Sequence, residues 1–125
     1  MAAEYLTVLE IIVIHDTLID VFGGTEGIRD MGALEAAVFR PQTGYYEDPI
    51  AEAAALMESL LQNHPFLDGN KRTAVAAADT HLRLNGLYFA GDPEAAYEFI
   101  ASGLLGGDLD RAEIEPWLRE NSAPL

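Results

Sequence analysis

The sequence has no cysteine, a single lysine and no long hydrophobic run among its 125 residues. The lack of cysteine excludes disulfides, thiol catalysis and cysteine-ligated zinc, and it is compatible with a cytoplasmic location. No apolar segment approaches the roughly 20 residues that span a bilayer, so we expect no membrane association. The N-terminal stretch MAAEYLTVLE has no basic start and no cleavage-site pattern, so we expect no signal peptide.

Basic side chains are also scarce, because 7 Lys and Arg residues stand against 21 Asp and Glu residues and give a net charge of −14. Such a chain repels phosphate backbones at long range, which argues against a nucleic-acid partner and against a ribonuclease. The acid surplus indicates either a solubilising surface or a basic partner segment. Half of the residues are apolar and lie along the whole chain, which predicts one folded domain over residues 1–125.

Apolar residues recur at helical intervals along most of the chain, and capping residues, glycines and prolines divide it into segments. The expected helices run, in order, from Thr7 to Gly23 and Gly24, from Asp30 to Pro41, from Asp48 to about Asn63, from Arg72 to Gly86, from Asp92 and Pro93 to Gly106 and Gly107, and from Asp110 onward. We therefore predict an all-α fold, a compact single-domain bundle of about six helices. The alanine-rich fourth helix should lie at its centre, because its side chains are small on all sides.

The shorter segments carry expectations of their own. Residues 42–49 are expected to form a loop or small hairpin that exposes Tyr45 and Tyr46, and residues 87–89 an extended link. Pro116 should kink or restart the sixth helix, because proline removes a backbone hydrogen bond. No internal repeat, low-complexity tract or linker separates these segments.

Some polar and aromatic residues are expected to pack or to cap rather than to bind a ligand. They are His15 and His81 within helices, Trp117 and Leu118 in the last helix, and Arg29 and Asp30 at a helix start. The first helix shows the helical interval, since Ile11, His15, Leu18 and Phe22 recur every three or four residues.

The only lysine lies in the stretch HPFLDGNKR, residues 64–72, directly before the fourth helix. A helix N-terminus offers free backbone N–H groups and a partial positive charge, which bind phosphates. Gly69 lets the backbone approach a ligand closely, and Asn70 can cap the helix or hold the loop. Lys71 and Arg72 add two full positive charges at the same place. This stretch therefore predicts an anion cradle.

Two further side chains of the stretch supply chemistry. Asp68 is a hard oxygen ligand, and Mg²⁺ is commonly held by one protein carboxylate together with phosphate oxygens. His64 is suited to take a proton from a hydroxyl near neutral pH. A base, a metal carboxylate and an anion cradle are the parts of a phosphate-transfer site. The same residue types are also ordinary turn formers, so a solvated loop without a ligand stays open as an interpretation.

The stretch resembles the signature of the Fic/Doc superfamily, whose Fic branch has the pattern H-x-F-x-[D/E]-G-N-G-R-x-x-R. Here the residues read H-P-F-L-D-G-N-K-R-T-A-V. The match is complete through Asn70, after which Lys71 replaces a glycine and Val75 takes the place of the second arginine. Both departures are typical of the Doc (death-on-curing) branch, whose motif ends in N-K-R. The stretches YLTVLEIIVIHD, FGGTEGIRDMGALEAAVFRPQ and HLRLNG are similar to the same branch, so the resemblance covers nearly the whole chain.

The resemblance implies a toxin of a toxin–antitoxin pair that acts as an ATP- and Mg²⁺-dependent protein kinase. Such a kinase transfers the γ-phosphate to a hydroxyl of a translation factor, elongation factor Tu for the type member, and arrests translation. The roles carried over are base for His64, Mg²⁺ ligand for Asp68, anion cradle for Gly69 and Asn70, and phosphate binding and catalysis for Lys71 and Arg72.

The resemblance also implies a partner, a Phd-like antitoxin whose C-terminal segment folds onto the toxin as a helix. The acidic surface predicts basic residues in that segment. The superfamily has a flap that lines up the target, and we place it in the loop of residues 42–49. Two alternatives stay open: an AMP transferase that keeps Fic chemistry despite Lys71 and Val75, and a non-catalytic helical interaction module.

Overall fold

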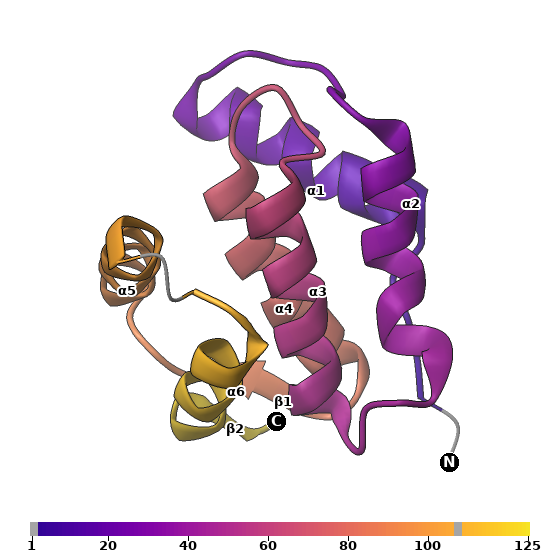
Figure 1. The fold of residues 1–125 in the computed structure, drawn as a ribbon, viewed down its shortest axis with the longest axis vertical. Helices are drawn as coiled ribbons and strands as arrows, with labels where there is room; N and C mark the ends of the chain where they lie inside the picture. The colour runs from indigo at the N-terminus through magenta and orange to yellow at the C-terminus, as the bar shows by residue number, and fades with distance from the viewer. Residues whose placement is uncertain (1–2, 107–108) are drawn as a thin grey trace.

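The computed structural model describes residues 3–106 and 109–125, and six α-helices lie in these ranges (Figure 1). The elements are α1 (Val8–Phe22), α2 (Met31–Phe39), the 3₁₀ helix η1 (Arg40–Thr43), α3 (Pro49–Asn63), α4 (Asn70–Leu84), β1 (Leu87–Phe89), α5 (Pro93–Gly106), α6 (Arg111–Glu120) and β2 (Ser122–Pro124). The all-α prediction is confirmed. The predicted end of the fifth helix at Gly106 is found, whereas Gly107 lies outside the described residues.

The helix starts follow from their capping side chains. Thr7 and Glu10 form a reciprocal capping box at α1, as their spacing predicted. The carboxylates of Asp30, Asp48 and Asp110 each accept a hydrogen bond from the backbone N–H three residues later, at α2, α3 and α6. Four of the six helix starts are therefore fixed by local chemistry that the sequence displays.

The centre of the bundle is formed by α3 and α4, which run side by side in Figure 1. α3 also packs against α2 and α6, while α4 also packs against α1 and α5. The prediction that α4 is central is confirmed, and α3 shares the centre with it, because α3 is buried along more of its length. The buried α3 residues are Ala51, Glu52, Ala53, Ala54, Ala55, Leu56, Met57, Ser59, Leu60 and Leu61.

Two predictions near the C-terminus have different outcomes: the extended conformation of residues 87–89 is confirmed, and a restart of the helix at Pro116 is not found. Residues 87–89 are strand β1, which pairs antiparallel with β2 so that Tyr88 lies opposite Ala123. Pro116 does not restart α6, which continues through it to Glu120. The helix holds because Ile114 and Leu118 are buried on either side of the proline. Trp117 and Leu118 anchor α6 in the core as predicted, with the Trp117 ring stacked on Phe99. Within the described ranges, no helix has the length and apolarity that crossing a bilayer requires.

Candidate active site

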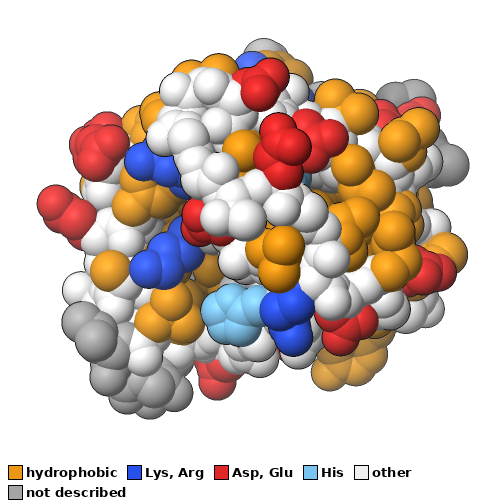
Figure 2. All heavy atoms as spheres, turned by 90° about the horizontal axis from the view of Figure 1, so that it is seen from above, with side chains coloured by type: hydrophobic (Ala, Val, Ile, Leu, Met, Phe, Trp, Pro, Cys, Tyr) orange, Lys and Arg blue, Asp and Glu red, His pale blue; other side chains and the backbone are white. Residues whose placement is uncertain are grey.

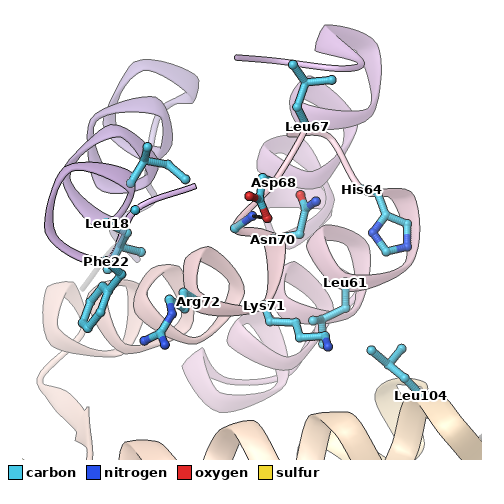
Figure 3. Close-up of a pocket in the computed structure, with 13 residues that line it drawn as sticks. Leu18, Phe22, Leu61, His64, Leu67, Asp68, Asn70, Lys71, Arg72 and Leu104 are labelled. Atoms are coloured by element: carbon cyan, nitrogen blue, oxygen red, sulfur yellow. Dashed lines mark hydrogen bonds between the residues drawn. The ribbon is translucent and has the colours of Figure 1, made fainter. Parts of the chain in front are cut away.

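The stretch between α3 and α4, residues 64–69, is here called the site loop, and it borders a pocket of about 360 Å³. The pocket lies at the end of the bundle where α3 ends and α4 begins (Figures 1 and 3). Its lining residues are Leu18, Ile19, Phe22, Gly23, Leu61, His64, Leu67, Asp68, Gly69, Asn70, Lys71, Arg72 and Leu104. All six residues predicted from the motif therefore border one cavity, and their roles remain predictions.

The apolar wall of the pocket comes partly from α1. Leu18 and Phe22, two of the residues that mark the helical interval of α1 in the sequence, line the pocket. The core contacts of α1 are made by Ile11, His15 and Ile19. Phe22 is 57% exposed, so its ring is available to a ligand or to a neighbouring side chain. Helical spacing alone does not separate a core stripe from a pocket wall one residue away.

His64 occupies an unusual backbone conformation at the C-cap of α3. Its φ of 45° makes it the only non-glycine residue with positive φ in residues 3–106 and 109–125. Non-glycine residues in the left-handed region persist where the surroundings hold them, and they cluster at functional sites. Arg29 provides such a hold, because its Nε donates to the His64 carbonyl at 2.6 Å and its Nη2 to that of Asn63. Arg29 thus caps α3, so its expected capping role is confirmed, although the helix that it caps is not the one that it precedes.

The site loop is bound to the connection between α1 and α2. The backbone N–H groups of Arg29 and Asp30 both donate to the carbonyl of Pro65, and that of Leu67 donates to Gly27. Ile28 and Phe66 form an isolated antiparallel bridge between the two segments. Residues 23–30 therefore lie alongside the site.

Asn70 holds the site loop from inside. Its Oδ1 accepts from the Phe66 N–H at 3.1 Å, and its Nδ2 donates to the Phe66 carbonyl at 2.9 Å. Of the two roles considered for Asn70, the structure shows the loop-holding one. Phe66 is itself buried, so the centre of the loop is anchored while His64 and Asp68 remain exposed at its ends.

Asp68 presents its carboxylate on the surface of the pocket (Figure 3). Hydrogen bonds from the backbone N–H groups of Thr25 and Gly69 lower the pKa of Asp68, so the group is ionised at neutral pH. Each oxygen accepts one of these bonds, at 3.1 and 2.8 Å, and keeps capacity for a further contact. Gly24 lies so close that a Cβ there would be 2.8 Å from Asp68 Oδ2. The carboxylate is therefore both charged and confined.

The donor set fits a metal ion that is shared with a ligand. In the described part of the chain, no three His, Cys, Asp or Glu side chains are grouped to hold a metal by themselves. Mg²⁺ normally takes one or two carboxylates and completes its shell with phosphate oxygens and water. One ionised carboxylate, Asp68, beside an anion-binding helix end matches that pattern.

The first turn of α4 supplies the anion-binding groups. Gly69, at φ 77°, is the N-cap, and its carbonyl accepts from the N–H of Thr73 at 3.0 Å. No described residue accepts from the backbone N–H groups of Asn70, Lys71 and Arg72. These free donors and the positive end of the helix dipole point into the pocket region, which suits a phosphate.

The two basic side chains of the motif differ in their surroundings. Lys71 forms no hydrogen bond and no ion pair with any described residue, and in Figure 3 it extends toward Leu61 and Leu104. The guanidinium of Arg72 lies between two aromatic rings, 4.0 Å from the centroid of Phe22 and 4.9 Å from that of Tyr97. Both distances are within the range of cation–π contacts, which leave the N–H groups of an arginine able to donate. Figure 2, which looks down on this end, shows basic and hydrophobic side chains around a histidine.

The loop of residues 42–49 does not border the pocket, so the placement of the flap there is wrong. It precedes the N-terminus of α3, whereas His64 follows the C-terminus, and fifteen helical residues span about 22 Å. It contains no strand, and its start is the 3₁₀ turn η1. The segment that lies against the site is 23–30, and its three glycines all have positive φ.

Comparison with known proteins places this geometry in a family. Residues 5–82 match the Fic/DOC family. The chain is 53% identical over 76 residues to "Toxin Doc" of Mycolicibacterium smegmatis, a match that covers 57% of this chain and 58% of that protein. It is 32% identical over 114 residues to "Protein kinase doc" of Escherichia phage P1, which covers 88% of this chain and 89% of that protein. The chain therefore belongs to the Fic/DOC family.

Proposed function

We propose that the protein is a toxin that transfers the γ-phosphate of ATP to a hydroxyl of a protein, with Mg²⁺ as cofactor. The observation that carries this proposal is the grouping of His64, Asp68 and the free N-terminal turn of α4 around one pocket. A base, an ionised carboxylate and an anion cradle in one cavity suit transfer of a phosphoryl group. The names of the two relatives, a toxin and a protein kinase, support the same reading.

The proposed division of work follows the contacts of each side chain. The N–H groups of the first turn of α4, together with Lys71, bind the phosphates and stabilise charge that develops during transfer. Arg72 donates from its free edge while Phe22 and Tyr97 hold its plane. Mg²⁺, when bound with the nucleotide, neutralises phosphate charge, and Asp68 is the side chain that would hold it.

His64 would act as the base that takes the proton of the acceptor hydroxyl. Its side chain is exposed at the pocket, and its backbone is fixed by Arg29. A base held in one orientation needs no rearrangement when the acceptor arrives. The same residue would therefore be silent in nucleotide binding and essential in transfer.

The partners follow from the proposed activity. We propose that elongation factor Tu carries the acceptor threonine, that a Phd-like antitoxin neutralises the toxin, and that both meet it in the cytoplasm. The net charge of −14 favours partner segments that carry basic residues.

The deciding experiment is a transfer assay with Mg²⁺, cell lysate and purified elongation factor Tu, run with ATP labelled at the γ- or the α-phosphate. We expect label from the γ position only, and none with His64→Ala. Label from the α position would instead establish AMP transfer. Val75 argues against that outcome, since it packs against the core beside Trp117 rather than lining the pocket. A chain that binds no nucleotide in a thermal-shift assay would be the non-catalytic module.

A further inference from the structure

Two side chains outside the site loop hydrogen-bond to its two ends. Arg29, from the connection between α1 and α2, donates to the carbonyls of Asn63 and His64. His15, from the middle of α1, lies with its Nε2 2.8 Å from the carbonyl oxygen of Asp68. One contact therefore lies at the proposed base and the other at the proposed metal ligand.

His15 holds its end of the loop in two directions. A carbonyl oxygen only accepts hydrogen bonds, so Nε2 carries the hydrogen and donates it. The ring is 1% exposed and is stacked on Phe66, with centroids 3.8 Å apart and planes 6° from parallel. The hydrogen bond, which lies in the plane of the His15 ring, holds the Asp68 carbonyl. The stack on Phe66, which is perpendicular to that plane, holds the middle of the site loop.

Arg29 holds the other end of the site loop by donating hydrogen bonds to backbone carbonyls at the C-terminus of α3. The last carbonyls of α3 have no N–H four residues later within the helix. The guanidinium fork of Arg29 donates to two of them, and one of these belongs to the left-handed His64. The N–H of Arg29 also donates to the Pro65 carbonyl at 2.8 Å. Removing this fork releases the backbone conformation that aims the imidazole.

We propose that His15 and Arg29 are positioning residues with separable effects. His15 sets the position of Asp68 and hence the affinity for Mg²⁺ with nucleotide, whereas Arg29 sets the position of His64 and hence the rate of transfer. The inference rests on the proposed function for the chemistry of the two ends. The separation follows because Phe66 lies between the two ends and Asn70 binds both its N–H and its carbonyl, two contacts that involve neither His15 nor Arg29.

The first test measures how firmly the site loop is held and does not require the protein to be active. His15→Phe keeps a flat ring but loses the donor, and His15→Gln keeps a donor but loses the ring. Hydrogen exchange is measured by NMR at the Thr25 and Gly69 amides, which both donate to the Asp68 carboxylate. We expect exchange there to be about tenfold faster or more in His15→Phe, with the buried amides of α3 unchanged. Arg29→Gln should instead accelerate exchange of the amide at position 29.

The second test is the kinetic split. His15→Phe should raise KM for Mg-ATP about tenfold with kcat nearly unchanged, and His15→Gln should restore most of the affinity. Arg29→Gln should lower kcat about tenfold with KM nearly unchanged. Arg83→Gln is the matched control, because Arg83 is an exposed arginine paired with Asp79 outside the pocket.

Equal changes in kcat and KM for both variants, or unchanged exchange at Thr25 and Gly69 in His15→Phe, would overturn the inference. The exchange measurement tests whether His15 and Arg29 hold the site loop even if the protein transfers no phosphate. A wild-type protein that transfers no phosphate would refute the proposed function, whereas unchanged exchange would refute only the roles of His15 and Arg29.

Discussion

The basic side chains of this protein fall into two groups that behave differently. Outside the site, all four arginines form an ion pair with a carboxylate: Arg40 with Glu58, Arg83 with Asp79, Arg111 with Glu115, and Arg119 with Asp48 and Glu115. At the site, Arg29, Lys71 and Arg72 pair with no carboxylate of the described residues, although acidic residues outnumber basic ones threefold.

The contrast separates basic side chains that stabilise the fold from basic side chains that are available to a ligand. Arg119 illustrates the first group, because hydrogen bonds to Asp48 and Glu115 raise its pKa and tie α6 to the start of α3. Lys71 illustrates the second group, since it lines the pocket together with the first turn of α4. The four paired arginines should therefore affect stability without activity, and Lys71 should affect activity without stability, whereas Arg29 acts through the backbone of the site loop.

The largest expected effect is that of Lys71→Ala on transfer. Removing a cation that stabilises developing charge typically lowers the rate by about 100-fold or more. The melting temperature should stay unchanged, because Lys71 is exposed and has no described partner to lose. Arg83→Ala is the control from the paired group and should keep full transfer. Lys71→Ala with activity within about tenfold of wild type would place Lys71 with the structural cations.

The next effect compares two neighbouring glycines that both have positive φ. Gly24→Ala places a Cβ 2.8 Å from the Asp68 carboxylate, whereas Gly23→Ala meets no atom within 4 Å. Both changes should lower stability by about 1–2 kcal/mol, because alanine is strained in this conformation. Only Gly24→Ala should weaken Mg-nucleotide binding, which titration calorimetry measures. Equal binding by the two variants would show that the confinement of Asp68 is unimportant.

The third prediction tests the paired group through Glu58. This side chain is 13% exposed, pairs with Arg40 at 2.6 Å and accepts from the N–H of Arg111. Glu58→Ala removes the carboxylate partner of Arg40, which keeps its hydrogen bonds to Tyr46 and Ser59, and the acceptor of the Arg111 N–H. The change should lower the free energy of unfolding by about 2–3 kcal/mol. Arg119→Ala breaks a more exposed pair and should cost only about 0.5 kcal/mol. Urea unfolding gives both values, and transfer per folded molecule should be unchanged in each.

A pH dependence is expected from the buried pair of His81 and Glu52, which lies away from the site. Burial lowers the pKa of His81, against the opposing effect of Glu52 at 3.2 Å. Below the ordinary histidine pKa of about 6.5, the unfolded chain therefore binds more protons than the folded one. Stability should fall with decreasing pH from that point toward the lowered pKa, by at most about 1.4 kcal/mol per pH unit. Above it the pair contributes no pH dependence.

Melting curves between pH 5.5 and 7.5 check this expectation, with His81→Gln as the comparison. Glutamine still donates to Glu52 but does not titrate, so the variant should lose fewer degrees than wild type on acidification. Equal losses would show that another group causes the acid sensitivity.

Much of this arrangement could be predicted from the sequence, because it depends on neighbouring residues. The helix starts follow from Thr7, Asp30, Asp48 and Asp110, whose side chains cap locally. The site loop was located because its residue types are contiguous in the chain. Their closeness in space thus required no knowledge of the fold.

The support of the site was not predictable, because it joins residues far apart through backbone atoms. Thr25 donates to Asp68 across 43 residues and His15 contacts its carbonyl across 53, and backbone donors carry no side-chain signal. The same limit hid strand β1, whose three residues are too few to show alternation. Leu18 and Phe22 share a helical period with core residues, so periodicity does not show that they line the pocket.

The smallest expected effect concerns two exposed apolar side chains, one in each region. Tyr45 is 75% exposed and contacts the edge of Tyr46 and the guanidinium of Arg111, far from the pocket. Leu67 is 55% exposed and lines the pocket. Tyr45→Ala should change stability by less than about 0.5 kcal/mol and leave transfer unchanged, whereas Leu67→Ala should raise KM for the protein acceptor.

The measurement is steady-state transfer to the acceptor protein at saturating Mg-ATP, with unfolding curves for both variants. Because the two residues are similarly exposed, any difference in KM reports their location rather than their exposure. A larger effect from Tyr45→Ala than from Leu67→Ala would mean that residues 42–49 do line up the acceptor. Residues 23–30 would then serve only to hold Asp68 and His64, and the paired arginines around Tyr45 would belong to acceptor binding as well as to stability.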